Sequence, residues 1–277
     1  MKESNIATKT GFLKKIFIKI CRLLGYEIID QNKYEVPTLQ KKLGDSISIP
    51  GKKSITVPLG EIKITRKISS LKVIFRSCTS ELIMDQNKKR LFEEDKNEYT
   101  FRSLNSILTS ISFAKKNFNN INYQIIVTDT NSKKEDLNQI KNILSKYSVD
   151  SKLIEINLND YKDKIIGNYT EAKFANMANL FTSLKIIKEE NGDLIYFVED
   201  DYIHKKESIT EMLFSFEKFS TIFKKDVILL PADYPYLYKK NDNTNIFIGH
   251  KKHWRLVEES LVTFMASRET VLSNFKN

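Results

Sequence analysis

The stretch LIYFVEDDYIH (residues 194–204) decides how the rest of the chain is interpreted. Its first five residues are apolar and have the length of a buried strand, and the acidic triplet Glu199, Asp200 and Asp201 follows at once. Adjacent carboxylates repel one another, and a divalent cation would relieve that repulsion. Mg²⁺ and Mn²⁺ bind carboxylate oxygens together with substrate phosphates. A solvated turn or the start of a helix is the alternative interpretation of the triplet.

From residue 71 onward, apolar runs of strand length alternate with segments of helical periodicity. The pattern predicts strands at 71–77, 123–128, 152–158, 194–198 and 227–230, and helices at 98–118, 133–146, 171–190 and 207–223. This alternation predicts an α/β fold, with an open, mainly parallel, Rossmann-like sheet and helices on both faces.

Polar residues end several of the predicted strands. Arg76 and Ser77 end the first strand, Asp129 ends the second, and the acidic triplet follows the fourth. Ligands of open α/β sheets bind beyond the carboxyl ends of the strands, so these are the candidate binding residues. Arginine at such a place suits a diphosphate, although a salt bridge beside the sheet is the alternative. The sequence has neither a GxGxxG loop nor a P-loop, so a metal ion is the expected means of holding a diphosphate.

These segments resemble GT-A fold glycosyltransferases, and family-2-like enzymes in particular. LIYFVEDDYIH is similar to their strand and DxD motif, and YQIIVTDTNS (123–132) is similar to their nucleoside-binding strand. Two helices of these enzymes are similar to FRSLNSILTSI (101–111) and GNYTEAKFANMANLFTSLKI (167–186). The resemblance implies that Asp201 binds Mn²⁺ or Mg²⁺, and that Glu199 and Asp200 face the ribose and the donor sugar. It also implies that Asp129 contacts the nucleoside. Arg76 and Ser77, at the end of the neighbouring strand, are expected beside it from their position in the sheet.

The implied activity is transfer of a sugar from a nucleoside-diphosphate sugar to a hydroxyl of a glycan or lipid-linked acceptor, mostly with inversion in this family. The chain departs from the family in the loop RSCT (76–79), which lacks the usual proline and asparagine. The Glu-Asp pair that typically supplies the catalytic base is also not evident. Two other functions therefore stay open. One is a catalytically inactive nucleotide-sugar binding module, and the other is a nucleotidyltransferase, which would normally show a glycine-rich first loop.

A second group of polar residues follows the predicted strands. Tryptophan and histidine suit sugar faces and hydroxyls, and arginine suits phosphate. Trp254 and Arg255 are therefore candidate acceptor contacts, and His253 is a candidate distal metal ligand, as a late histidine is in some GT-A enzymes. Glu259 and Asp233 are the candidate catalytic bases. An ordinary loop whose tryptophan packs on the core, and a turn between prolines, are the alternatives.

The positive charge is concentrated before the predicted catalytic domain at residues 71–277. Residues 1–70 carry 14 Lys and Arg against 6 Asp and Glu, whereas residues 71–277 carry 31 against 29. Residues 11–25 (GFLKKIFIKICRLLG) place apolar side chains on one half of a helical wheel and basic ones on the other. This predicts a basic amphipathic helix on an anionic membrane surface, with docking on the catalytic domain as the alternative. The rest of residues 1–70 is expected to be a linker with a small hairpin.

The composition argues against several classes of protein. Two cysteines, Cys21 and Cys78, make no disulfide framework and no zinc motif. The excess charge lies on an amphipathic helix, which disfavours nucleic-acid binding. No run of 18 apolar residues and no convincing signal peptide is found. We therefore expect a cytoplasmic protein that is peripheral at the inner face of the membrane.

Overall fold

The computed structural model describes residues 12–26, 63–80, 94–232, 245–257 and 262–274. The chain divides into two compact units, residues 1–38 and residues 39–277, which are considered separately. The first contains α1 (Phe12–Leu23), and this confirms the predicted helix. The predicted domain boundary at residues 70/71 stays a prediction, and most of the predicted linker lies outside the described residues.

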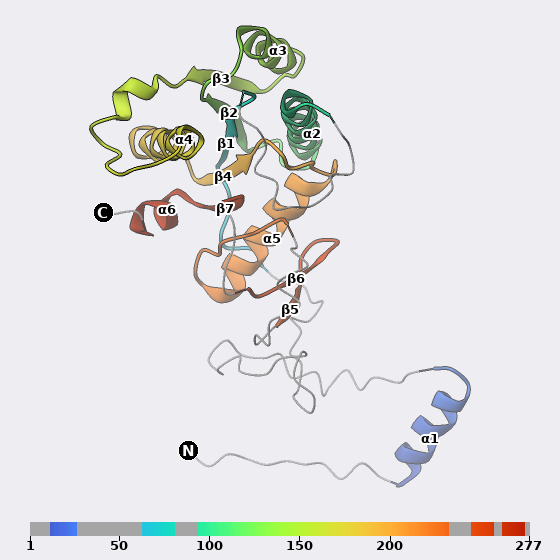
Figure 1. Ribbon diagram of the computed structural model, residues 1–277. Helices are drawn as coiled ribbons and strands as arrows, with labels where there is room; N and C mark the ends of the chain where they lie inside the picture. The colour runs from blue at the N-terminus through green and yellow to red at the C-terminus, as the bar shows by residue number, and fades with distance from the viewer. Residues whose placement is uncertain (1–11, 27–62, 81–93, 233–244, 258–261, 275–277) are drawn as a thin grey trace. The chain divides into compact units, whose positions relative to one another are not determined.

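The second unit alternates strands and helices along the chain (Figure 1). Its elements up to the acidic triplet are β1 (Ser70–Ser77), α2 (Lys96–Asn117), β2 (Asn122–Asp129), α3 (Lys134–Ser145), β3 (Asp150–Glu155), the 3-10 helix η2 (Leu158–Tyr161), α4 (Glu171–Glu189) and β4 (Leu194–Glu199). The later elements are α5 (Ser208–Phe223), β5 (Ile246–Ile248), β6 (His253–Arg255), β7 (Phe264–Ser267) and α6 (Arg268–Asn274). The helices and strands predicted between residues 71 and 223 are all present, close to their predicted bounds.

One sheet of five strands has the order β3-β2-β1-β4-β7. The strands β1 to β4 pair in parallel, and β7 pairs antiparallel with β4. The chain proceeds from β1 through β2 to β3 on one side, and then returns to place β4 on the other side of β1. The strand order therefore reverses at β1, which makes the carboxyl ends of β1 and β4 a topological switch point. The predicted α/β, mainly parallel fold class is confirmed.

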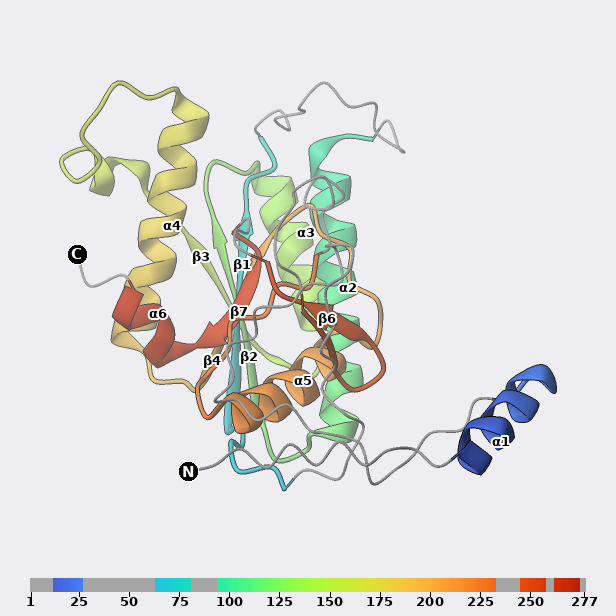
Figure 2. The same ribbon diagram turned by 90° about the horizontal axis from the view of Figure 1, so that it is seen from below.

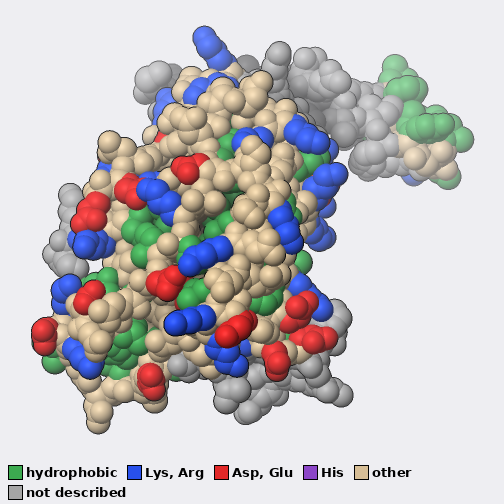
Figure 3. Space-filling view, turned by 90° about the horizontal axis from the view of Figure 1, so that it is seen from above, with side chains coloured by type: hydrophobic (Ala, Val, Ile, Leu, Met, Phe, Trp, Pro, Cys, Tyr) green, Lys and Arg blue, Asp and Glu red, His purple; other side chains and the backbone are tan. Residues whose placement is uncertain are grey.

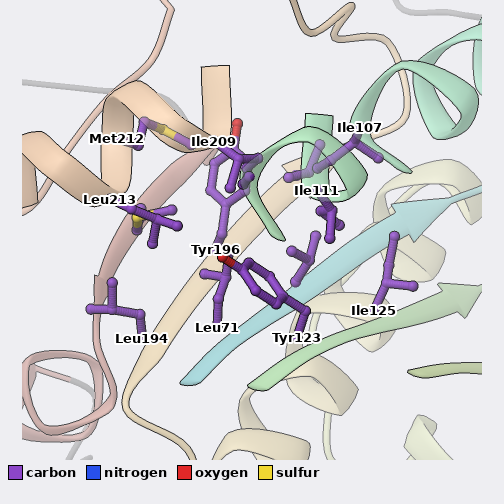
Figure 4. Close-up of a cluster of buried hydrophobic side chains, with 14 of the residues drawn as sticks. Leu71, Ile107, Ile111, Tyr123, Ile125, Leu194, Tyr196, Ile209, Met212 and Leu213 are labelled. Atoms are coloured by element: carbon purple, nitrogen blue, oxygen red, sulfur yellow. The ribbon is translucent and has the colours of Figure 1, made fainter. Parts of the chain in front are cut away.

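Helices cover both faces of this sheet because alternate residues of the strands are apolar on both sides. In β1, Val73 and Phe75 pack in the core that contains α2, α3 and α5, whereas Ile74 packs in the core with α4 and α6. Figures 1 and 2 show these helices in two layers around the sheet. Figure 4 shows Tyr196 of β4 within the first core, close to side chains of α2 and α5 such as Ile111. The second core holds α4 on the face of the sheet opposite α2.

The prediction of a strand at 227–230 is wrong, since only an isolated β-bridge at Leu229 forms there. Leu229 exchanges two backbone hydrogen bonds of 2.8 Å with Met265, and no longer ladder forms there. Pro231 follows, and a proline has no backbone N–H to extend a ladder. The antiparallel strand β7 and the β5–β6 hairpin were not predicted, because each is only three or four residues long.

Candidate functional site

The polar residues at the ends of β1, β2 and β4 lie side by side, as the sequence predicted. Strand pairing sets Arg76 opposite Glu199 and Ser77 opposite Asp129. The Ser77 hydroxyl donates to Asp129 Oδ2 at 2.6 Å. Since β1 is the middle strand, these groups meet at the switch point, where ligands of α/β sheets bind.

Asp200 is buried and engaged by groups from two other segments. Its Oδ2 accepts hydrogen bonds from Thr100 Oγ1 at 2.8 Å and from the backbone N–H of Cys78 at 3.2 Å. Its Oδ1 forms an ion pair with Lys96 Nζ, and both side chains are largely buried. Asp200 therefore joins the start of α2 to the loop after β1. The predicted repulsion within the acidic triplet is relieved at this position by a lysine of the protein.

Arg76 is buried beside the triplet with hydrogen-bonding capacity to spare. Its Nη2 donates to Asn176 Oδ1 of α4, and its Nη1 lies 3.8 Å from Glu199 Oε1. Neither Nε nor Nη1 has a hydrogen-bond partner among the described residues. Burial lowers the pKa of Arg76, although Glu199 and Asp200 oppose this. A buried guanidinium with unused donors is costly on its own, and an anionic ligand would satisfy it.

Two carboxyl groups of the site have raised pKa values. Burial raises the pKa of Glu199, and Asp201 and Asp200 raise it further, whereas Arg76 lowers it. Burial also raises the pKa of Asp129, against hydrogen bonds from Ser132 and Ser77. Both shifts have the same cause, since desolvation disfavours the charged form of a carboxyl group. A bound cation would favour the ionised forms again.

Asp201 is the exposed member of the triplet. Among the described residues, no group of three or more His, Cys, Asp and Glu side chains is arranged to hold a metal ion. A metal site enclosed by protein ligands alone is therefore not supported there. Magnesium-type sites often use only one or two carboxylates and take substrate phosphates for the rest. The available carboxylates fit an ion that is shared with a diphosphate.

The predicted acceptor block lies on the β5–β6 hairpin and packs on α5. Trp254 meets the ring of Phe219 edge to face with centroids 6.4 Å apart, and its Nε1 donates to Glu211 Oε1 at 3.2 Å. The ring of His250 stacks on Phe214 at 4.2 Å. These contacts match the alternative interpretation, in which the tryptophan packs on the core.

The contacts described for the hairpin are with α5. After Asp200 the chain runs along α2. Asp200 contacts Lys96 near the start of this helix, and the backbone N–H of Ile209 donates to Ser110 Oγ, further along the helix, at 2.9 Å. Asp200 also contacts Thr100, and the ten residues of helix from there to Ser110 are roughly 15 Å long at 1.5 Å per residue. The hairpin packs on α5, which begins at the contact with Ser110. The roles predicted for His253, Trp254 and Arg255 thus gain no support from the arrangement.

The two candidate bases, Asp233 and Glu259, lie outside the described residues and stay predictions. Thr263, four positions after Glu259 in the sequence, is described and lies beside the acidic triplet. Its hydroxyl accepts a hydrogen bond from the backbone N–H of Glu199 at 3.3 Å. The sequence analysis missed Lys96, Thr100 and Asn176, which reach the site from helices. No local pattern marks them, because their partners are 100 or more positions away in the chain.

Comparisons with known proteins add little at the level of sequence. No protein-family model and no curated protein matches this chain. Among solved structures, S. aureus TarS 1-349 is similar over 74% of this chain and 49% of that chain, with 14% identity and a TM-score of 0.41. This chain therefore spans about half of its length.

Two further structures are similar over shorter stretches. A second structure of S. aureus TarS matches 54% of this chain and 20% of that chain, with 18% identity and a TM-score of 0.30. The WbbM bifunctional glycosyltransferase matches 55% of this chain and 21% of that chain, with 14% identity and a TM-score of 0.30. A glycosyltransferase is thus among the structures to which this chain is similar.

Proposed function

We propose that this protein is a glycosyltransferase that moves a sugar from a nucleoside-diphosphate sugar to a hydroxyl of a glycan or lipid-linked acceptor. The observation that carries the proposal is the buried, partly unsatisfied Arg76 beside the acidic triplet at the switch point. A nucleoside-diphosphate sugar needs donors for its phosphates and acceptors for its hydroxyls. Both kinds of group meet at these strand ends.

In the proposed mechanism the side chains hold the donor in place for attack. The unused donors of Arg76 suit a phosphate oxygen, and Asp129 and Glu199 suit hydroxyls of the ribose and the sugar. Asp201, as the exposed carboxylate of the triplet, is the proposed ligand of Mn²⁺ or Mg²⁺. Such an ion, when bound, neutralises the charge that develops on the leaving diphosphate. Asp200 helps indirectly, because its bonds to α2 hold the triplet in position.

The proposed reaction also needs a base that takes the proton of the acceptor hydroxyl. Glu259 and Asp233 remain the candidates, and inversion would place the base on the face opposite the diphosphate. Replacing each by its amide should reduce turnover by ~100-fold if it is the base, with donor binding unchanged. If neither change has this effect, both assignments are wrong. The hairpin residues His253, Trp254 and Arg255 are left out of the mechanism, since Trp254 packs on α5 and the hairpin backbone donates to Glu211 of that helix.

Calorimetry with a nucleoside diphosphate, with and without Mn²⁺, tests the proposal. Asp201→Asn should abolish the metal-dependent part of binding and leave the unfolding temperature unchanged, because the side chain is exposed. Glu189→Gln is the matched control: it removes one exposed carboxylate at the far end of α4 from Asn176. Metal-dependent binding of Asp201→Asn at the original affinity would contradict the metal site and most of the case for this activity.

A catalytically inactive nucleotide-sugar binding module is the second candidate. The ion pairs of Asp200 with Lys96 and of Glu199 with Arg76 favour it, because these carboxylates are already partnered without a metal. The two candidates differ in turnover and not in binding. Slow hydrolysis of the donor sugar in the presence of Mn²⁺ would support the enzyme, whereas tight binding without any hydrolysis or transfer would support the binding module.

A further inference from the structure

The helix α1 carries a broad apolar face that is exposed. Phe12, Leu13 and Leu23 are 77%, 81% and 80% exposed, and Phe17 and Ile20 are exposed as well. Figure 3 shows hydrophobic side chains gathered on this helix, whereas on the displayed face of the second unit Lys and Arg alternate with Asp and Glu. Large apolar faces of this kind usually mark a surface that contacts a partner or a membrane.

The C-terminal end of α1 is defined by local interactions of the chain. Gly25 adopts a left-handed φ of 84°, and the backbone N–H of Tyr26 donates to the carbonyl of Cys21 at 2.9 Å. This is the hydrogen bond of a Schellman motif, which ends a helix locally. A helix of 12 residues is nevertheless marginal in water, because nucleation is unfavourable. Its stability therefore depends on a surface that covers the apolar face.

Charge indicates what that surface is. The helix contains the basic residues Lys14, Lys15, Lys19 and Arg22 and no acidic residue. At 100° per residue these four lie opposite the apolar half of the wheel. A second copy of the helix would bring four more positive charges, and a helix pair would cover only a narrow seam of the apolar half. Residues 71–277 are nearly balanced in charge, with 31 basic and 29 acidic residues, so they offer no marked anionic excess.

We propose that α1 lies in the plane of an anionic phospholipid bilayer, with its apolar half among the acyl chains and its basic residues at the headgroup phosphates. Twelve residues of helix are roughly 18 Å long, less than the thickness of a hydrocarbon core. Nowhere in the described parts of the chain does a helix have the length and apolar character to cross a membrane. The inference does not depend on the proposed activity, since it concerns binding of the helix alone.

Sedimentation of the full chain with vesicles tests this inference. Vesicles of phosphatidylcholine with phosphatidylserine should bind the protein at least ~100-fold more tightly than phosphatidylcholine alone, because each basic residue at such a surface contributes about fivefold. Lys15→Gln with Lys19→Gln should weaken binding to the mixed vesicles by ~25-fold. The control pair, Lys185→Gln with Lys188→Gln on the exposed surface of α4, should leave binding unchanged.

A variant of the apolar face separates lipid from protein partners. Phe17→Ser should weaken vesicle binding by ~10-fold or more, since the ring no longer enters the bilayer. Its unfolding temperature and its state of association should stay those of the original protein. Equal binding to both kinds of vesicle, or no binding to either, would overturn the proposal. A lowered unfolding temperature of Phe17→Ser would instead assign the face to the second unit, and loss of a dimer would assign it to a second copy.

Discussion

The neighbouring carboxylates Asp200 and Asp201 should respond to the same substitution in different ways. Asp200 forms its ion pair with Lys96 at side-chain exposures of 10% and 15%, whereas Asp201 is exposed. Removing one partner of a buried pair costs about 3–5 kcal/mol, because the other charge is left uncompensated. An asparagine at position 200 still accepts from Thr100, so we expect about 3 kcal/mol for Asp200→Asn. The same change at Asp201 should cost at most about 0.5 kcal/mol, as exposed substitutions usually do.

Urea unfolding of both variants measures this difference in the free energy of unfolding. Adding Lys96→Met to Asp200→Asn should recover part of the loss, with a coupling energy of about 1–3 kcal/mol between the two positions. Lys141→Met, which removes a lysine from an exposed ion pair, is the control and should show no coupling. If Asp200→Asn and Asp201→Asn are equally stable, Lys96 does not hold the acidic triplet, and the reasoning about charge compensation fails.

Three further predictions concern α5 and its surroundings. Burial lowers the pKa of His204 to about 4, so the unfolded chain binds the proton first and stability should fall by about 3 kcal/mol as pH decreases from 6.5 to 4; a flat profile in urea titrations would contradict this. The pKa of Glu211 is lowered because hydrogen bonds from the hairpin backbone and Trp254 outweigh its burial. The contribution of Glu211 to the free energy of unfolding should therefore be complete above its unfolded pKa and be lost as the pH falls. Glu211→Gln should abolish this pH dependence, measured by the fluorescence of Trp254, the single tryptophan. A Cβ at Gly249 would lie 2.4 Å from Glu211 Oε1, so Gly249→Ala should displace the hairpin and change the same fluorescence, whereas an unchanged spectrum would show that the turn adapts.

The strand ends of the site were predictable because they combine two local signals. An apolar run such as LIYFV marks a buried strand, and the polar residue that ends it marks the edge of the sheet. The order of strands then places Arg76, Asp129 and Glu199 together without any knowledge of their partners. Their contacts were not predictable, since Lys96 and Asn176 lie on helices whose sequence pattern records only which side is buried.

The contacts of the hairpin could not be predicted from the order of the chain. Trp254 and Arg255 follow the strand of the acidic triplet in the sequence, and the sequence analysis made them candidate acceptor contacts. In the structure the chain runs along α2 after Asp200 and then forms α5, on which the hairpin packs, whereas Thr263 returns to the backbone of Glu199. The sequence carries only a weak signal for the packing of the hairpin on α5. Glu211 is buried because it accepts hydrogen bonds from the hairpin backbone, whereas a glutamate in a helix is usually exposed.

The order of strands in the sheet also bears on how the chain is made. The strands β1, β2 and β3 are consecutive, so they can pair once residue 155 has been synthesised, whereas the other edge of β1 stays open until β4 is complete at Glu199. Pairing of such distant segments is slow to form. Hydrogen-exchange pulse labelling should find amides of β2 protected before those of β4. During that interval an apolar strand edge is available to other chains, so aggregation during expression should depend on temperature and synthesis rate more than on the stability of the finished fold.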